Sequence, residues 1–304
     1  MNFTLKQLRY VEAAGRTGSI TNAAQELCIS QSSITAAIDA LEDILGFDLF
    51  IRAPAKGISL TPAGTEALGY VGNFLQQTSH LASDLKSIGG EPNGVLRLAC
   101  YMTAAPHVLP LILTSFVRSH PRVRVELSEG DITTVGERLL DGSVDLGCTY
   151  SVGLPDNISL LPLFRPPPYA VISALDSLAS QASVTLEELV GRPMILLDLP
   201  FGRSYYLDLF RARGLEPNII HTTRSSEMAR ALVAVGLGFS LLNIRAKVDD
   251  AAYVCRPIRT PCAPIEFGVA LRSGMRHPRI VTSFLQHCQK LRDTEAFDHL
   301  IVKD

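Results

Sequence analysis

Residues 19–64 constrain the fold of this 304-residue chain more than any other stretch. Two short helical segments flank a tight turn at Cys28 and Ile29, and a compact hairpin and the start of a long helix follow. Ser30 can cap the second helix. Apolar residues in this helix recur at spacings of four, three and four, at Ile34, Ile38, Leu41 and Leu45. This spacing places one apolar stripe on one helix face and predicts a small helix-turn-helix domain with a hairpin wing.

The opposite face of the second helix is polar near its start. It carries short hydrogen-bonding side chains at Gln31, Ser32, Ser33 and Thr35. A recognition helix presents such groups, from its N-terminal end, to base edges in a major groove. Ser19 or Thr21 can cap the preceding helix, and we count both, with Ser30, among the candidate DNA contacts. The pattern predicts a face that binds double-stranded DNA.

This segment resembles the winged helix-turn-helix of LysR-type transcriptional regulators. The matching residues are Ala23-Ala24, Ser30-Gln31, Ile38, Leu41-Glu42, Gly46, Leu49-Phe50-Ile51-Arg52 and Leu60-Thr61-Pro62-Ala63-Gly64. The whole run, at the N-terminus of a chain of about the family's length, is far more specific than a bare helix-turn-helix. The alternative is a small helical domain that binds no nucleic acid.

Two features depart from the usual DNA-binding pattern. The family often has arginine or lysine where this chain has Ala36 and Ala37, so guanine cannot be read from those positions. Residues 1–60 hold five cations and six acids, although phosphate neutralisation supplies much of the affinity for DNA. We therefore expect Arg52 and Lys56, on the wing, to contact phosphates.

Composition limits the class of protein. The length suggests at least two structural units, and 47% hydrophobic residues can form a sizeable core. A net charge of −2 excludes a generally polycationic chain. No apolar signal segment follows Met1, and the apolar run Ala231 to Leu242 is too short to cross a bilayer. We expect a cytoplasmic protein without a membrane partner, whose six cysteines are buried thiols without metal or redox spacing.

From Pro62 to about Ile88 the sequence predicts one long helix. Its apolar positions alternate at spacings of four and three, at Ala67, Val71, Phe74, Thr78, Leu81, Leu85 and Ile88. This is a coiled-coil seam, and we expect it to pair two chains, with dimerisation residues Val71, Phe74, Leu81 and Leu85. The alternative is an amphipathic helix packed on its own domain. Residues 89–94 then form a linker.

Strands and helices alternate in the rest of the chain. Predicted strands lie at 95–100, 123–129, 145–150, 169–173, 194–198, 219–222, 239–243 and 265–271, and predicted helices at 103–119, 135–140, 186–190, 204–213, 227–235 and 277–291. The stiff segment 165–168 marks a crossover to a second lobe. The alternation predicts an open α/β sheet in each of two lobes.

Two such lobes resemble the periplasmic-binding-protein architecture of LysR-type effector domains. The matching residues are Gly94-Val95-Leu96-Arg97-Leu98, Leu109-Pro110, Pro121 and Leu140-Asp141-Gly142-Ser143-Val144-Asp145-Leu146. We therefore expect an α/β multidomain chain: a winged helix-turn-helix at 1–61, a linker and dimerisation helix at 62–90 and an effector-binding domain at 91–304. Lobe I would cover about 91–164 and 266–304, and lobe II about 165–265. The resemblance also implies a dyadic operator, a small-molecule effector and a homodimer or homotetramer.

The sequence offers little for an enzyme. It has no nucleophile elbow, no metal-binding His-Glu-x-x-His helix and no phosphate loop. Gly236-Leu237-Gly238 lacks a third glycine and precedes a strand, so it is no dinucleotide fingerprint. We predict a ligand-responsive transcription factor without catalysis, cofactor or metal. The alternative is a small-solute-binding protein without a transcriptional role.

The effector should bind where strands end at their carboxyl edge. The loops after the predicted strands supply the candidates Tyr101, Met102, Thr103, Thr133, Thr134, Phe201, Arg203 and Ser225. Expected helix starts at Thr103 and Ser225, and several hydroxyls, favour a small carboxylate. Arg203 could clamp such an anion, or it could form a surface ion pair.

Overall fold

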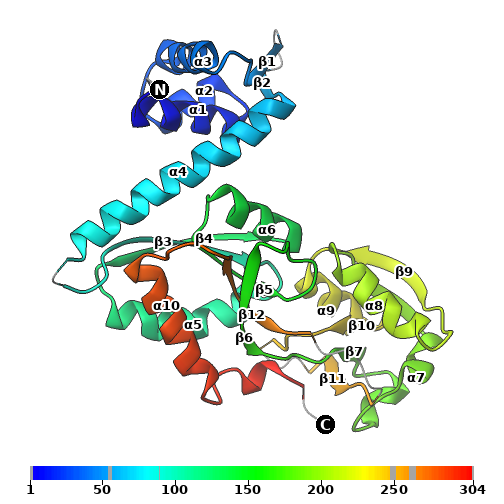
Figure 1. The fold of residues 1–304 in the computed structure, drawn as a ribbon. Coiled ribbons are helices and arrows are strands. Elements are labelled where there is room, and N and C mark those ends of the chain that lie inside the picture. Colours follow the sequence, from blue (N-terminus) through cyan, green and yellow to red (C-terminus); the bar gives the residue numbers. More distant parts are fainter. Residues whose placement is uncertain (1–2, 54–56, 89, 247–250, 260–264, 303–304) are drawn as a thin grey trace. The chain divides into compact units, whose positions relative to one another are not determined.

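The computed structural model describes residues 3–53, 57–88, 90–246, 251–259 and 265–302 (Figure 1). The chain divides into two compact units, Met1–Gly89 with Arg138–Val144, and Gly90–Glu137 with Asp145–Asp304. Within the described ranges, no helix has both the length and the apolar character needed to cross a membrane.

The first unit begins with three helices, α1 (Leu5–Thr17), α2 (Ile20–Glu26) and α3 (Gln31–Leu45). Ser19 caps α2 and Ser30 caps α3, as the sequence predicts, whereas Thr21 lies inside α2. Sequence analysis missed α1, which starts with a capping box between Thr4 and Gln7. The predicted stripe of α3 is buried at Ile34, Ile38 and Leu41, but Leu45 at its end is exposed.

The wing is the antiparallel pair β1 (Phe50–Ala53) and β2 (Gly57–Leu60). Thr61 caps α4 (Pro62–Lys86), which follows with Pro62 in its first turn. The helix ends two residues before the predicted Ile88, because Ser87 is the C-cap. Lys56 lies outside the described residues.

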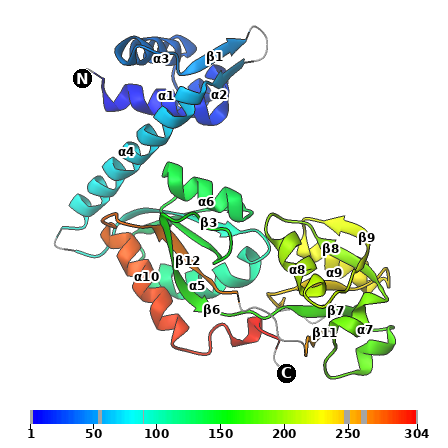
Figure 2. The same cartoon turned by 45° about the vertical axis from the view of Figure 1, so that its right-hand side comes forward.

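Lobe I of the second unit contains a five-stranded sheet in the order β4-β3-β5-β12-β6 (Figure 1), and Figure 2 shows β3, β12 and β6 of this sheet from another side. Its strands are β3 (Gly94–Tyr101), β4 (Val123–Gly130), β5 (Leu146–Tyr150), β6 (Ile158–Phe164) and β12 (Phe267–Arg272). β3 pairs in parallel with β4 and β5, whereas β12 is antiparallel to β5 and β6. Its helices are α5 (Ala105–Ser119), α6 (Ile132–Asp141) and α10 (Arg279–Arg292), and η2 (Asp298–Leu300) follows. Parallel pairing places the carboxyl ends of β3, β4 and β5 at one edge.

Lobe II has two sheets where sequence analysis predicted one. β7 (Tyr169–Ser173) pairs with β10 (Ser240–Leu242) and β11 (Tyr253–Pro257), while β8 (Pro193–Leu197) pairs in parallel with β9 (Asn218–Thr223). A single bridge between Met194 and Phe239 joins the two sheets. Gly238 precedes this bridge at φ +149°, and a Cβ there would lie 2.3 Å from the Pro193 carbonyl oxygen. The remaining elements are η1 (Ser177–Ser180), α7 (Leu186–Val190), α8 (Gly202–Arg211) and α9 (Ser226–Ala234).

Two further expectations need correction. α5 starts at Ala105, so Thr103 lies in the turn before the helix and not at its N-terminus. Cys28 is exposed in the turn between α2 and α3, and Cys255 is half-buried, so the thiols are not uniformly buried. Cys100 and Cys148 do lie in the core, at paired positions of β3 and β5.

Candidate functional site

The start of α3 presents a polar surface. Gln31 and Ser32 are exposed, while Ser33 and Thr35 are half-buried. The Ser33 backbone N–H donates to Ser30 Oγ over 3.2 Å, and the Thr35 hydroxyl donates to the Gln31 carbonyl oxygen over 3.1 Å. The hydroxyls of Ser30 and Thr35 thus form hydrogen bonds with the backbone of α3. Gln31 and Ser32 are the side chains best placed to contact a ligand.

Neighbouring positions limit what this surface can read. Ala37 is buried, so no side chain at that position could reach a base, whereas Ala36 is exposed. In α2, Ser19 Oγ accepts from the Asn22 backbone N–H over 3.3 Å, and Thr21 is exposed.

Arg52 of the wing has partners within its own domain. Its guanidinium forms ion pairs with Asp39 and, over 3.1 Å, with Glu42. The hydrogen bond that Arg52 donates to the Asp39 carboxylate raises the pKa of Arg52. Glu42 also accepts from the backbone N–H groups of Leu49 and Phe50. Arg52 therefore fastens the wing to α3, a role that sequence analysis did not anticipate.

The predicted seam of α4 divides into two parts. Val71 packs against the core of its own domain, with Ala67 and Leu68. Phe74, Leu81 and Leu85 are 49%, 59% and 57% exposed in the single chain. The apolar face beyond the first turns of α4 is thus open to a partner.

A cavity of about 30 Å³ lies between the lobes of the second unit. It has room for no more than about two water molecules. Lobe I contributes Tyr101, Thr103, Ile132, Tyr150 and Val152, and lobe II contributes Leu197, Phe201, Gly202, Tyr205, Tyr206, Ser226, Arg230, Leu242, Asn243 and Ile244, with Ile265 at the boundary between the lobes. Burial raises the pKa of Tyr101, Tyr150 and Tyr206, so these phenols stay neutral.

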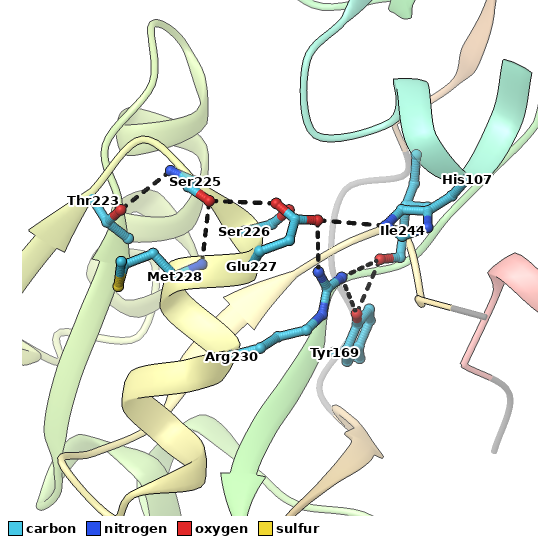
Figure 3. A network of polar contacts seen from close by, with 9 residues as sticks. All are labelled: His107, Tyr169, Thr223, Ser225, Ser226, Glu227, Met228, Arg230 and Ile244. Carbon is cyan, nitrogen blue, oxygen red and sulfur yellow. Dashed lines mark hydrogen bonds and ion pairs between the residues drawn. The ribbon is translucent and has the colours of Figure 1, made fainter. Parts of the chain in front are cut away.

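Arg230 of α9 is the buried cation of this cavity, with 6% of its surface exposed. Its Nη2 donates to the Ile244 carbonyl oxygen over 3.0 Å and to Tyr169 Oη over 3.4 Å, and its Nη1 lies 3.4 Å from Glu227 Oε1 (Figure 3). Burial acts to lower the pKa of Arg230, but the interactions with Tyr169 and Glu227 outweigh it. The guanidinium is therefore charged and fixed in place.

Among the described residues, several side-chain contacts cross from one lobe to the other. Arg224 Nη2 donates to Asp131 Oδ2 over 2.8 Å. His107 of α5 faces Glu227 of α9 with 3.7 Å between Nε2 and Oε1 (Figure 3). Phe201 lies so close to Gly153 that a Cβ on the glycine would be 2.7 Å from the phenyl ring. The lobes are closed over the cavity.

Comparison with known proteins identifies both units. Residues 5–65 match the bacterial regulatory helix-turn-helix of the lysR family, and residues 89–292 match the LysR substrate binding domain. The chain belongs to the LysR family of transcriptional regulators. The family supports a transcriptional regulator over the alternative of a small-solute-binding protein without a transcriptional role.

Individual LysR regulators are similar over most of their length. The HTH-type transcriptional regulator CysB of Haemophilus influenzae is 28% identical over 97% of both chains. CysB of Burkholderia cenocepacia is 31% identical over 78% of this chain and 77% of the relative. The crystal structure of HinK, a LysR family regulator from Pseudomonas aeruginosa, is 29% identical, covers 96% of this chain and 99% of its own, and superposes with a TM-score of 0.64.

The candidate effector residues of this LysR chain fall into two groups. Tyr101, Thr103 and Phe201 line the cavity. Met102, Thr133, Thr134, Arg203 and Ser225 are outside its lining. Most of these have local partners: Thr134 donates to Asp131, Arg203 pairs with Asp198 over 3.1 Å, and Ser225 caps α9. Sequence analysis left open whether Arg203 binds an anion or forms a surface ion pair, and the structure shows the ion pair with Asp198.

Sequence analysis missed Arg230 and Asn243. Glu227 and Arg230 have the i, i+3 spacing of a surface ion pair, and nothing in that spacing signals burial. Among the described residues, no group of three or more His, Cys, Asp or Glu side chains is arranged to hold a metal ion.

Proposed function

We propose that this LysR regulator binds a dyadic DNA operator through α3 and responds to a small molecule in the cavity between its lobes. The observation that supports effector binding is the cavity between the lobes, which is lined by a fixed, buried cation, Arg230. The relatives are transcriptional regulators, and we propose that this chain likewise has no catalytic activity. Because it acts on DNA, we propose that it works in the cytoplasm.

At the operator, Gln31 and Ser32 would contact base edges. Their exposure at the N-terminal end of α3 supports this assignment. Ser33, Thr35, Ser19, Thr21 and Ser30 would contribute through helix geometry or phosphate contacts. We assign no phosphate contact to Arg52, because its charge is already paired with Asp39 and Glu42.

A dyadic operator needs two recognition helices. The exposed side chains of Phe74, Leu81 and Leu85 support pairing of two α4 helices. Two α3 helices would then reach half-sites separated by about 34–36 Å, one turn of DNA. Effector domains would join such dimers into a tetramer.

The test is a gel shift with genomic fragments, followed by footprinting of the retained DNA. We expect retention of fragments with palindromic half-sites and a protected region spanning more than one helical turn. Absence of sequence-selective retention at low salt would contradict the proposal.

A further inference from the structure

The guanidinium of Arg230 has one buried N–H donor, at Nε, without a hydrogen-bond partner among the described residues. Its Nη groups bind Glu227, Ile244 and Tyr169. A buried donor without a partner destabilises the folded state, and natural proteins keep few of them. Arg230 also lines the cavity. An acceptor bound there would remove this deficit.

The positive charge of Arg230 is compensated only in part. Its carboxylate partner Glu227 is 60% exposed on its side chain, and this carboxylate also accepts from the hydroxyls of Ser225 and Ser226 and faces His107. Glu227 is therefore shared between several donors and solvated. A buried arginine with a divided counter-charge favours an anionic ligand, and a carboxylate is the anion whose two oxygens match its planar donors.

The wall around Arg230 is rich in aromatic rings, from Tyr101, Tyr150, Phe201, Tyr205 and Tyr206. Tyr101 and Tyr150 already meet edge to face, with ring centroids 5.1 Å apart, as do Tyr205 and Tyr206 at 5.3 Å. Ring faces and edges of this kind favour a flat aromatic partner.

The closed cavity is too small for an organic acid, so one wall must move. Phe201 is the candidate, because it is 45% exposed and its ring rests on Gly153 of the other lobe. Its backbone is in an unfavourable conformation, with φ +60°. Moving this ring and separating the lobes would enlarge the space beside Arg230.

We propose that the cavity binds a small aromatic carboxylic acid, with the carboxylate on Arg230 and the ring among the tyrosines, once Phe201 has moved away from Gly153. The proposal rests on the proposed function, since it names the ligand class of the same cavity.

The experiment measures binding of three probes to the full-length chain by calorimetry and thermal shift. Benzoate supplies both the ring and the charge, benzamide keeps the ring without the charge, and acetate keeps the charge without the ring. We expect benzoate to bind at least about tenfold more tightly than either of the others. Equal binding of benzoate and benzamide, or of benzoate and acetate, would overturn the proposal, as would no binding of benzoate at millimolar concentration.

Arg230→Gln should weaken benzoate binding at least about tenfold. Arg203→Gln is the matched control, because Arg203 is an arginine near the cavity whose charge pairs with Asp198, and it should leave benzoate affinity within about twofold. Unchanged affinity in a folded Arg230→Gln protein would place the carboxylate elsewhere and refute the assignment.

Arg230 is buried, so its variant could fail to fold. The three-probe comparison on the unmodified chain decides the ligand class in that case, and Thr103→Val, which removes a hydroxyl lining the cavity, tests the location. Loss of benzoate affinity in Thr103→Val supports this cavity, and full retention contradicts it. Operator retention in the gel shift without any probe tests the proposed function separately, so a failure of benzoate is distinguishable from a failure of DNA binding.

Discussion

Arg224 Nη2 lies 2.8 Å from Asp131 Oδ2, and this ion pair joins the carboxyl end of β9 in lobe II to that of β4 in lobe I. The Asp131 carboxylate also accepts from the backbone N–H and hydroxyl of Thr134. Thr134 of lobe I therefore holds the Asp131 carboxylate in position, and this carboxylate binds Arg224 of lobe II.

Removing the Arg224–Asp131 ion pair should weaken the contact between the two lobes. We expect Arg224→Ala to speed hydrogen exchange at the start of α9, where Ser226 lines the cavity, with a loss of thermal stability of no more than about 1 kcal/mol, because Arg224 is largely exposed. Arg211→Ala, which removes a surface pair within α8, serves as control. Equal hydrogen-exchange rates in Arg224→Ala and Arg211→Ala would show that the Arg224–Asp131 ion pair does not hold the two lobes together.

The same pair has a defined pH dependence. Burial acts to raise the pKa of Asp131, but the Thr134 hydrogen bonds and Arg224 outweigh it, so the pKa is lowered. Because the pKa is lowered on folding, the ionised Asp131 contributes its full share to the free energy of unfolding above the ordinary pKa of 3.8. This contribution is lost as the pH falls through the folded-state pKa. Thermal unfolding of Asp131→Asn should thus differ from the unmodified chain at pH 7 and converge with it in strong acid. A difference that persists there would contradict the argument.

Gln31→Ala should weaken operator binding by about 1–3 kcal/mol and relax sequence preference at one position. The reason is the exposed side chain at the start of α3. Quantitative gel shifts over operator variants measure it, with exposed Gln289→Ala in α10 as the matched control. A uniform loss over all sequences would indicate a backbone contact instead.

Arg52→Ala should leave the salt dependence of operator binding unchanged. Its charge is paired with Asp39 and Glu42, so it neutralises no phosphate in the free domain. A salt slope reduced by about one would show that Arg52 changes partners on DNA.

Phe74→Asp should convert the dimer to monomer, because it places a charge on the exposed apolar face of α4. Light scattering at micromolar concentration measures the mass. Gln77→Asp, at an exposed polar position of the same helix, should remain dimeric. A dimeric Phe74→Asp protein would locate the interface elsewhere.

Gly153→Ala should displace Phe201 and accelerate entry of benzoate. Its Cβ would collide with the phenyl ring at 2.7 Å, and its φ of +68° adds backbone strain. Gly214→Ala is the matched control, since Gly214 has the same φ and no atom within 4 Å of its added Cβ. Stopped-flow tyrosine fluorescence compares the two, and equal entry rates would show that Phe201 does not close the cavity.

Local signals explain which elements were predictable. Ser19 and Ser30 cap their helices by accepting from backbone N–H groups three residues further on, so the sequence near them is sufficient to place α2 and α3. The alternation of strands and helices likewise indicates two α/β lobes.

Side-chain partners distant in sequence explain the rest. Arg52 meets Asp39 thirteen residues earlier, and Arg224 meets Asp131 93 residues earlier, so no local pattern indicates that these arginines are paired. The burial of Arg230 depends on Tyr169 and Ile244 in the same way. Position along the chain could suggest which loops face the cavity, but not which of their side chains turn inward.

The backbone conformation at Phe201 affects the free energy of lobe closure. With φ +60° and ψ −34°, and a 2.7 Å hydrogen bond from the Gly202 N–H to the Pro200 carbonyl, it forms a γ-turn of the strained, positive-φ kind. Such strain costs about 1–3 kcal/mol. An opening that moves the ring away from Gly153 and also rearranges this γ-turn would relieve it. The open and closed populations would then be more evenly balanced, and an effector that prefers one of them by a few kcal/mol could switch the whole molecule.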